Sequence, residues 1–369
     1  MTPSDIPSNI PLNIDDVDPE WMSNLLGHHV ADLTVRQIGQ GVGIMGDIYR
    51  VGLQYEKQAA EAPSSLVVKL PSSFEENRTQ GVALGMFEAE VRFYNELADQ
   101  VAVGLPKVYR ADIVSGAADF VIVMEDLSDL QMVDQAVGMT ADQAMTAVNI
   151  LAHVHAVWWD RAKDETMDWI PSMVGPRIEF VDQALGEMLP VFLDAFENAL
   201  PDGGRELYER FTGNYLKVNR VVADRSPWTL VHQDFRVENL LFGEAGSDRM
   251  VVLDWQGIGR GPGAYDLGYL LGGSMAPELR REHESRLLAA YHNQLSTLGV
   301  TDYSAQQLAE DYAIAHLQGG LATAMFVGGG MDLSNERGRE LAATMASRHA
   351  TAALDHDGLT RLDDIVGQS

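Results

Sequence analysis

The sequence predicts an α+β protein with a smaller N-terminal lobe, built from an antiparallel sheet and a helix, and a larger, mostly helical C-terminal lobe. Short strand-like apolar stretches joined by glycine-containing turns occupy residues 33–124, and long segments of helical periodicity follow from residue 141. Between them, the apolar run 120–124 changes abruptly into acidic, turn-forming residues, and we place the connector between the two lobes there. The predicted division is a leader with a helix (1–28), an N-terminal lobe (29–124) and a C-terminal lobe (125–369).

The composition is typical of a soluble globular protein. Hydrophobic residues make up 46% of the 369 residues and charged residues 22%, which suits two or three structural units with sizeable cores. The net charge is 26 − 54 = −28. A nucleic acid or an anionic membrane is therefore not an expected partner, because binding phosphates requires a basic surface. The acidity is compatible with a cationic substrate, but solubility or a salty habitat explains it more simply.

The sequence contains no cysteine, which excludes disulfides, thiolate metal sites and a cysteine nucleophile. Residues 1–21 are acidic and proline-rich and lack the basic and apolar regions of a signal peptide. No apolar run approaches the length of a membrane span. We therefore predict a cytoplasmic protein with no membrane partner.

The first predicted elements are a loose leader (1–18) and a helix that begins at Asp18-Pro19, where proline suits an early helical position. Two strands follow between residues 33 and 51, joined by a glycine-rich turn that includes Gly41 and Gly43. Glycines permit tight turns and a close approach of the backbone to a phosphate, so these two are candidate nucleotide contacts. The turn is not a P-loop, because no G-K-[ST] follows it.

A lysine and a glutamate in the next two elements form a candidate pair. Lys69 lies near the end of a predicted strand (65–70), and Glu90 lies 21 residues later in a predicted helix (85–100). A strand lysine held by a helix glutamate is the pair with which a kinase-type site binds nucleotide phosphates. The alternatives are a lysine on an edge strand with its head in water and a solvated helix carboxylate.

The C-terminal part is predicted to be helical along most of its length. Residues 176–223 should form two helices with a break at 200–204, and Gly328 to Gly330 should form a loop. The two histidines of the first long helix, His153 and His155, are expected to pack rather than to bind a ligand. The other predicted helices span residues 141–159, 278–298, 304–326 and 335–355.

The segment Leu230–Gln256 carries the strongest motif in the chain. His232, Asp234 and Asn239 form the pattern H-x-D-x-x-x-x-N, and Asp254 follows fifteen residues later, at the end of an apolar run. This spacing is typical of a kinase-type phosphoryl-transfer site. Asp234 would accept the proton of a substrate hydroxyl, and Asn239 and Asp254 would hold magnesium, which prefers oxygen ligands and few carboxylates. His232 is expected to hold the loop. The alternative is a surface hairpin with solvated polar residues.

Two further predictions concern the surroundings of this motif. Asp266, at the start of a helix after a glycine-rich turn, is a candidate to brace the loop through hydrogen bonds, although a carboxylate that interacts with the helix dipole is an equal alternative. Asp234, Arg236 and Glu238 would form the polar floor of an acceptor pocket. The expected apolar and aromatic lining consists of Ile178, Phe180, Met188, Phe192, Phe196, Tyr312, His316 and Met325.

Together these motifs resemble the aminoglycoside phosphotransferase and choline kinase-like superfamily, and most closely the ecdysteroid kinase-like (CHK-like) branch and its bacterial relatives. The resemblance covers roughly residues 30–330 and implies a bilobal protein-kinase-like fold that uses magnesium with ATP, or with GTP as elsewhere in the superfamily. It also implies adenine binding by the connector residues Met124, Glu125, Asp126 and Leu127. The segments that carry it are VVKLP (67–71), EVRFYNELA (90–98), VMEDL (123–127), LAHVHAVWW (151–159), VHQDFRVENLLF (231–242), VLDWQ (252–256) and YDLGYLL (265–271).

The resemblance implies a small-molecule kinase that transfers the γ-phosphate of ATP to a hydroxyl of a small organic acceptor. The motif D-W-Q stands where protein kinases have D-F-G, and no activation loop or A-P-E segment is readable after it, which argues against a protein substrate. The alternative is a nucleotide-binding pseudokinase that acts as a regulatory or interaction module. Because all six polar residues of the site are present, we favour the enzyme. The motifs do not specify the acceptor or the oligomeric state.

Overall fold

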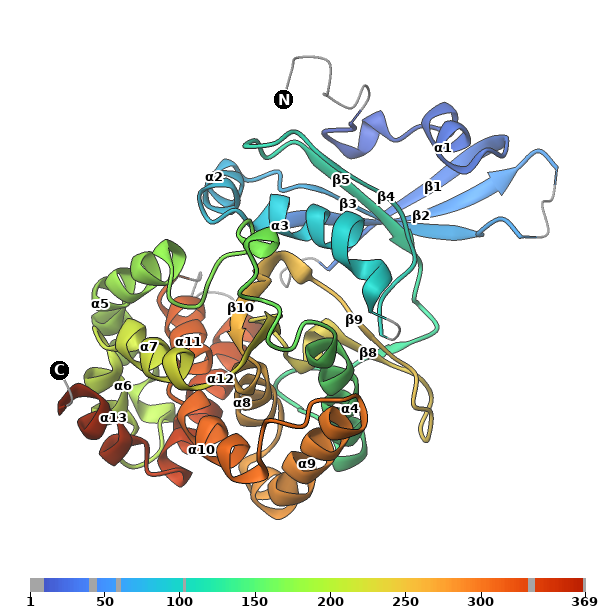
Figure 1. Ribbon diagram of the computed structural model, residues 1–369. Coiled ribbons are helices and arrows are strands. Elements are labelled where there is room, and N and C mark those ends of the chain that lie inside the picture. The colour runs from blue at the N-terminus through green and yellow to red at the C-terminus, as the bar shows by residue number, and fades with distance from the viewer. Residues whose placement is uncertain (1–9, 40–44, 58–60, 102–103, 331–335, 368–369) are drawn as a thin grey trace. The chain divides into compact units, whose positions relative to one another are not determined.

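The computed structural model describes residues 10–39, 45–57, 61–101, 104–330 and 336–367 (Figure 1). The chain forms two compact units, and the first consists of residues 1–100, 105–129 and 254–257. The remaining residues, 101–104, 130–253 and 258–369, form the second. The first unit therefore extends beyond the predicted boundary at residue 124, includes the first helix together with the sheet, and takes in the short segment that begins at Asp254.

The first unit is built on a five-stranded antiparallel sheet with the strand order β1-β2-β3-β5-β4. Residues alternate between the two faces of a strand, so Leu66, Val68 and Leu70 share one face of β3 while Lys69 points to the other. Because β3 is hydrogen-bonded to β2 and β5, it is a central strand, and the edge-strand alternative for Lys69 is wrong. The strands are β1 (Val30–Ile38), β2 (Gly46–Tyr55), β3 (Ser65–Pro71), β4 (Val108–Ile113) and β5 (Phe120–Glu125).

Helices cover both faces of this sheet. Helix α1 (Pro19–Leu26) packs its buried Trp21 against the face that contains Leu66 and Val68. Helix α3 (Met86–Arg92) lies against the other face, where the rings of Phe87 and Phe120 stack at 4.8 Å. Helix α2 (Glu75–Ala83), which precedes α3, was not predicted.

Local hydrogen bonds explain where the first helix begins. Asp18 accepts the Trp21 N–H at 2.7 Å and caps α1, which begins at Pro19 as predicted. The preceding residues are ordered as well: Ile14–Asp16 form a 3₁₀ turn capped by Asn13, and Val17 is 4% exposed in the core. The predicted loose leader is therefore wrong for residues 10–18, because this segment closes one end of the apolar face.

The second unit contains two small sheets and most of the helices. The strand orders are β6-β8-β9 and β10-β7, and both sheets are antiparallel. The strands are β6 (Gln131–Met132), β7 (Trp228–Val231), β8 (Leu240–Phe242), β9 (Met250–Val252) and β10 (Gly259–Pro262). The helices are α4 (Ala141–Val157), α5 (Pro176–Phe196), α6 (Gly204–Phe211), α7 (Tyr215–Arg225), α8 (Ala264–Ser274), α9 (Pro277–Thr297), α10 (Ala305–Ala315), α11 (Gly319–Gly330), α12 (Glu336–Asp355) and α13 (Gly358–Gly367).

Several helix boundaries in this unit differ from the predictions. Residues 176–223 contain three helices rather than two, because the chain turns again at Gly213, whose φ of +78° suits only glycine well. The predicted helix 304–326 is divided into α10 and α11. Gly328 belongs to α11 and not to a loop. A Cβ at this position would lie 2.8 Å from the Phe196 ring. The glycine therefore permits close packing of α11 against α5.

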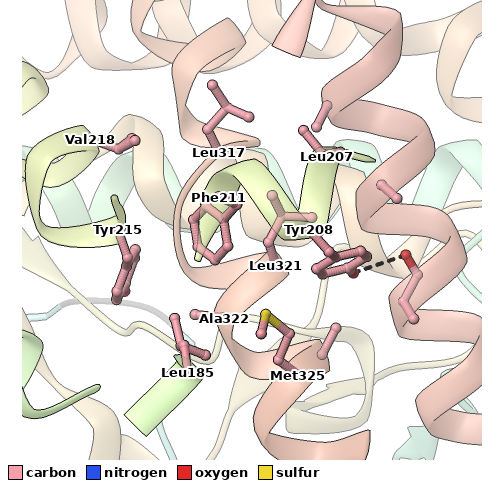
Figure 2. Packing of buried hydrophobic residues seen from close by; sticks show 14 of the residues in the cluster. Leu185, Leu207, Tyr208, Phe211, Tyr215, Val218, Leu317, Leu321, Ala322 and Met325 are labelled. Atoms are coloured by element: carbon pink, nitrogen blue, oxygen red, sulfur yellow. Dashed lines mark hydrogen bonds between the residues drawn. The ribbon is translucent and has the colours of Figure 1, made fainter. Parts of the chain in front are cut away.

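The core of the second unit lies among α5, α6, α7, α11 and α12, as Figure 2 shows. Tyr208 is fully buried there, and its hydroxyl donates to the carbonyl of Ala346 at 3.1 Å. Four of the residues expected to line an acceptor pocket belong to this core instead, namely Ile178, Phe192, Phe196 and Met325. Their helical spacing therefore reflects packing between helices and not the wall of a pocket. No helix in the described parts of the chain is long and apolar enough to cross a membrane.

Candidate active site

The first unit brings together three of the predicted site residues. The Lys69 ammonium donates to Glu90 Oε2 at 2.7 Å and to Asp254 Oδ1 at 3.1 Å. Lys69 and Glu90 are 7% and 1% exposed, so the pair is shielded from water. Burial favours a lower pKa for Lys69, but the charges of Asp254 and Glu90 outweigh it and hold its pKa above the ordinary value. Burial also raises the pKa of Glu90, against the opposing charge of Lys69.

The segment after β9 holds Asp254 in a constrained geometry. Asp254 has a φ of +65°, a left-handed conformation that a non-glycine residue adopts at a cost. The next ring, Trp255, stacks on Phe93 at 3.9 Å with an interplanar angle of 8°. Phe93 begins a π-helical turn, Phe93–Leu97, that continues α3. Gln256 donates to Asp254 Oδ2 at 3.2 Å. The D-W-Q motif thus fixes its carboxylate through the backbone, a stacked ring and an amide.

The connector residues are anchored to the sheet of the first unit. Asp126 accepts a hydrogen bond from Ser65 at 2.6 Å and pairs with Arg50 at 3.0 Å. Burial favours a higher pKa for Asp126, but the Ser65 hydroxyl and the Arg50 charge lower it overall. Met124 and Leu127 are buried and Glu125 is partly exposed. The Asp126 side chain is therefore committed to holding the connector, and adenine binding there stays a prediction.

The predicted nucleotide contacts of the glycine-rich turn stay a prediction. Gly41 and Gly43 lie outside the described residues.

The second unit holds the H-x-D-x-x-x-x-N loop, and its central residue is Asp234. One carboxylate oxygen, Oδ1, accepts from the Tyr269 hydroxyl at 2.8 Å, and Oδ2 accepts from Asn239 Nδ2 at 2.8 Å. The Arg236 guanidinium lies 3.3 Å from Oδ1 and also pairs with the buried Glu238. The Asp234 side chain remains 30% exposed, so the carboxylate is held by the protein but accessible.

Asp266 holds the loop through two hydrogen bonds, which decides between the two alternatives for that residue. Its Oδ2 accepts the His232 N–H at 2.7 Å and its Oδ1 accepts the Gln233 N–H at 2.9 Å. Gln233 has a φ of +66°, so these bonds stabilise a strained backbone. His155 is 3.2 Å from Asp266 Oδ2 and is a packed core histidine, as expected. His232 Nε2 contacts the Leu253 carbonyl at 3.0 Å, which agrees with a loop-holding role.

Sequence reasoning missed two side chains next to this loop. Tyr269 follows Asp266 by three residues, so both lie on one face of α8; that spacing was the available signal. Arg177, near the start of α5, donates to the Gln233 side chain and, at 3.2 Å, to the Ile258 carbonyl. No local pattern marks Arg177, because its partners are distant in sequence.

The two predicted magnesium ligands belong to different units, Asn239 to the second and Asp254 to the first. Asn239 donates from Nδ2 to both the carbonyl and the carboxylate of Asp234, which leaves its amide oxygen for a cation. Asp254 supplies a carboxylate. Within the described ranges there is no cluster of three or more His, Cys, Asp or Glu side chains arranged to bind a metal. An amide oxygen and a carboxylate are each ligand types that magnesium accepts beside phosphates and water, so the joint role of Asn239 and Asp254 stays a prediction.

Comparisons with known proteins bear on the family and the fold. A model of the Ecdysteroid kinase-like family matches residues 40–301. The choline kinase of Cryptosporidium parvum Iowa II aligns with a TM-score of 0.53 at 11% identity, over 90% of this chain and 91% of that chain. Choline kinase LicA of Streptococcus pneumoniae aligns with a TM-score of 0.50 at 17% identity, over 90% and 98%.

A third structure, the GDP complex of a mutant aminoglycoside 2′-phosphotransferase IIIa, aligns with a TM-score of 0.51 at 14% identity, over 92% of each chain. No curated protein matches the sequence. At such identities the structural likeness establishes a kinase-like fold, which the sequence had predicted, and says nothing of the acceptor.

Proposed function

Because this chain belongs to the ecdysteroid kinase-like family, we propose that it is an ATP-dependent O-phosphotransferase that acts on a hydroxyl of a small organic molecule. The observation that carries the proposal is the double attachment of the Asp234 carboxylate, which is held on both oxygens and still 30% exposed. A solvated surface hairpin would not hold a carboxylate in this way. The buried Lys69–Glu90 pair, with Asp254 at 3.1 Å, supplies matching residues for the nucleotide.

In the proposed reaction, Asp234 accepts the proton of the acceptor hydroxyl as the hydroxyl oxygen attacks the γ-phosphorus. The bond to the β,γ-bridging oxygen breaks, and ADP leaves. Lys69 contacts the nucleotide phosphates, and Glu90 holds the Lys69 ammonium in position. Asn239 and Asp254 would hold magnesium, which supplies charge neutralisation for the phosphate oxygens when it is bound. Asp234 then releases its proton to water.

The ion pairs of the catalytic loop support a neutral or anionic acceptor over a polycationic one, because the Asp234 and Glu238 carboxylates are already paired with Arg236. Two guanidinium groups, those of Arg177 and Arg236, lie against the loop residues Gln233 and Asp234. Burial lowers the pKa of Arg177, but a guanidinium remains charged at any physiological pH. On α5 the carboxylates of Glu179, Glu187 and Asp194 are exposed, whereas Asp182 is half-buried and accepts the Tyr215 N–H at 2.8 Å. A polycationic aminoglycoside would need converging carboxylates instead.

The proposal is tested by screening hydroxylated compounds for stimulated ADP release, with mass spectrometry to identify a phosphorylated product. The expected result is one product class with neutral or anionic acceptors and its loss in Asp234→Asn, which should retain MgATP binding. General-base assistance is worth about 10²–10⁴-fold. Saturable phosphorylation of kanamycin-like compounds at micromolar concentration would overturn the acceptor class. MgATP binding without any product would instead favour a nucleotide-binding regulatory module.

A further inference from the structure

The geometry points to Tyr269 as a positioning residue: its hydroxyl fixes the direction of the Asp234 carboxylate toward the acceptor hydroxyl. This inference rests on the proposed function and adds to it a residue from outside the kinase-type motif. Tyr269 touches the base and not the reacting atoms, so it would act through Asp234.

The Tyr269 hydroxyl is committed to donating. The side chain is 2% exposed, and its oxygen lies 2.8 Å from Asp234 Oδ1. Burial, together with the negative charge of Asp234, raises the pKa of Tyr269 well above its ordinary value. The group therefore stays a phenol, and a buried phenol O–H without an acceptor would be costly. Its acceptor is the Asp234 carboxylate oxygen, and the Thr323 side chain is a second hydrogen-bond partner of the hydroxyl.

The carboxylate is held from both sides. Asn239 Nδ2 donates to Oδ2 at 2.8 Å while Tyr269 donates to Oδ1, so rotation of the carboxyl plane would break one bond or the other. An ionised carboxylate offers about four lone-pair sites. These two hydrogen bonds occupy one site on each oxygen, and the Arg236 guanidinium, 3.3 Å from Oδ1, adds a longer ionic contact. Removing the tyrosine hydroxyl would leave Oδ1 with the Arg236 contact alone and free the carboxyl plane to turn.

Helix α8 is built to hold this hydroxyl in place. It contacts the catalytic loop at three points along one side: through Asp266, through Tyr269, and through Ser274, whose hydroxyl accepts the Val237 N–H at 3.1 Å. Glycines in α8 allow the neighbouring helices to approach it closely. A Cβ at Gly268 would lie 2.7 Å from the Ala315 Cβ. A Cβ at Gly273 would lie 2.4 Å from the His349 ring. Helices α10 and α12 therefore pack closely against α8 and restrict its movement.

The experiment compares two variants that each delete one buried tyrosine hydroxyl. Tyr269→Phe keeps the ring, which packs with Met173, Val231 and Tyr265. Tyr208→Phe is the matched control, because its hydroxyl bonds a backbone carbonyl in the helical core. Turnover is measured as ADP release with the acceptor found by the screen. We expect Tyr269→Phe to lower kcat about 10-fold, with acceptor KM and MgATP affinity within about twofold of wild type.

The control should keep kcat within about twofold while losing comparable thermal stability. Equal kcat values for Tyr269→Phe and Tyr208→Phe would overturn the inference, as would a loss seen in acceptor KM alone. A double-mutant cycle of Tyr269→Phe with Asp234→Ala, measured by thermal unfolding, tests the contact without turnover. Non-additive melting temperatures support it and additive ones overturn it. A wild-type protein without turnover would overturn the proposed function, and this failure is distinguishable from additive unfolding.

Discussion

His349, one of the most deeply buried histidines, should make the protein sensitive to mild acid. The residue lies in α12 and is 1% exposed, and its ring fills the space beside two glycines: a Cβ at Gly273 or Gly320 would lie 2.4 or 2.2 Å from it. Burial, with a contribution from the charge of Arg348, lowers the pKa of His349 from 6.5 to about 3. The folded protein therefore keeps this imidazole neutral over the ordinary pH range.

The sign of the effect follows from the difference between the folded and unfolded states. In the unfolded chain His349 binds a proton below pH 6.5, whereas in the folded protein it does so only near pH 3. The stability is therefore fully present above pH 6.5 and is lost as the pH falls toward 3. Each pH unit in this window costs about 1.4 kcal/mol, so at about pH 5 the loss from one histidine is about 2 kcal/mol.

The assay is denaturant unfolding at about pH 7.5 and about pH 5 for the wild type and His349→Gln, whose amide is neutral at both values. The variant should lose about 2 kcal/mol less than the wild type between the two conditions, whatever its stability at the higher pH. His29→Gln, at a side chain that is 70% exposed, is the control for the substitution itself. Equal pH dependence for wild type and His349→Gln would refute the reasoning.

Three further predictions concern the site. Lys69→Met leaves the carboxylate of Glu90 buried without its cation, so turnover should be lost and the free energy of unfolding should fall by about 3–5 kcal/mol. Adding Glu90→Gln should restore part of that stability, and no recovery in the double variant would contradict the pairing. Asp254→Ala should weaken MgATP binding much more than binding of metal-free ATP in calorimetry, and equal losses would argue against metal ligation. Asp266→Asn leaves one acceptor oxygen for the N–H groups of His232 and Gln233, so kcat should fall while MgATP affinity is kept. A loss in MgATP affinity alone would argue against the bracing role.

Much of the site could be predicted because its residues are fixed by short-range spacing. The motif from His232 to Asn239 spans eight residues, so its side chains stay together in any compact loop. The alternation of β3 and the periodicity of α3 likewise brought Lys69 and Glu90 to the same side of the sheet. The bracing role of Asp266 was harder to decide, because a helix-start carboxylate can also be satisfied by its own helix; its bonds to His232 and Gln233 decide it.

Other features depended on which helices pack together, and the sequence alone could not rank those partners. The apolar residues of α5 looked equally suited to a pocket wall or a core, and contacts with α6 and α11 place Phe192 and Phe196 in the core. The same contacts explain why Gly328 continues a helix: glycine is disfavoured in an isolated helix, but here it allows close approach to Phe196.

By itself, the sequence determined the α+β organisation, the membership of a kinase-like family and the chemical types present at the site, because these depend on local periodicity and on motif spacing. The tertiary structure decided how the carboxylate of Asp234 is held. Its second donor, Tyr269, is 35 residues away and outside the H-x-D-x-x-x-x-N motif, and only the close packing of α8 against the loop brings the two oxygens within 2.8 Å. A hydrogen bond between distant residues depends on the fold that joins them, so it leaves no periodic signal in the chain.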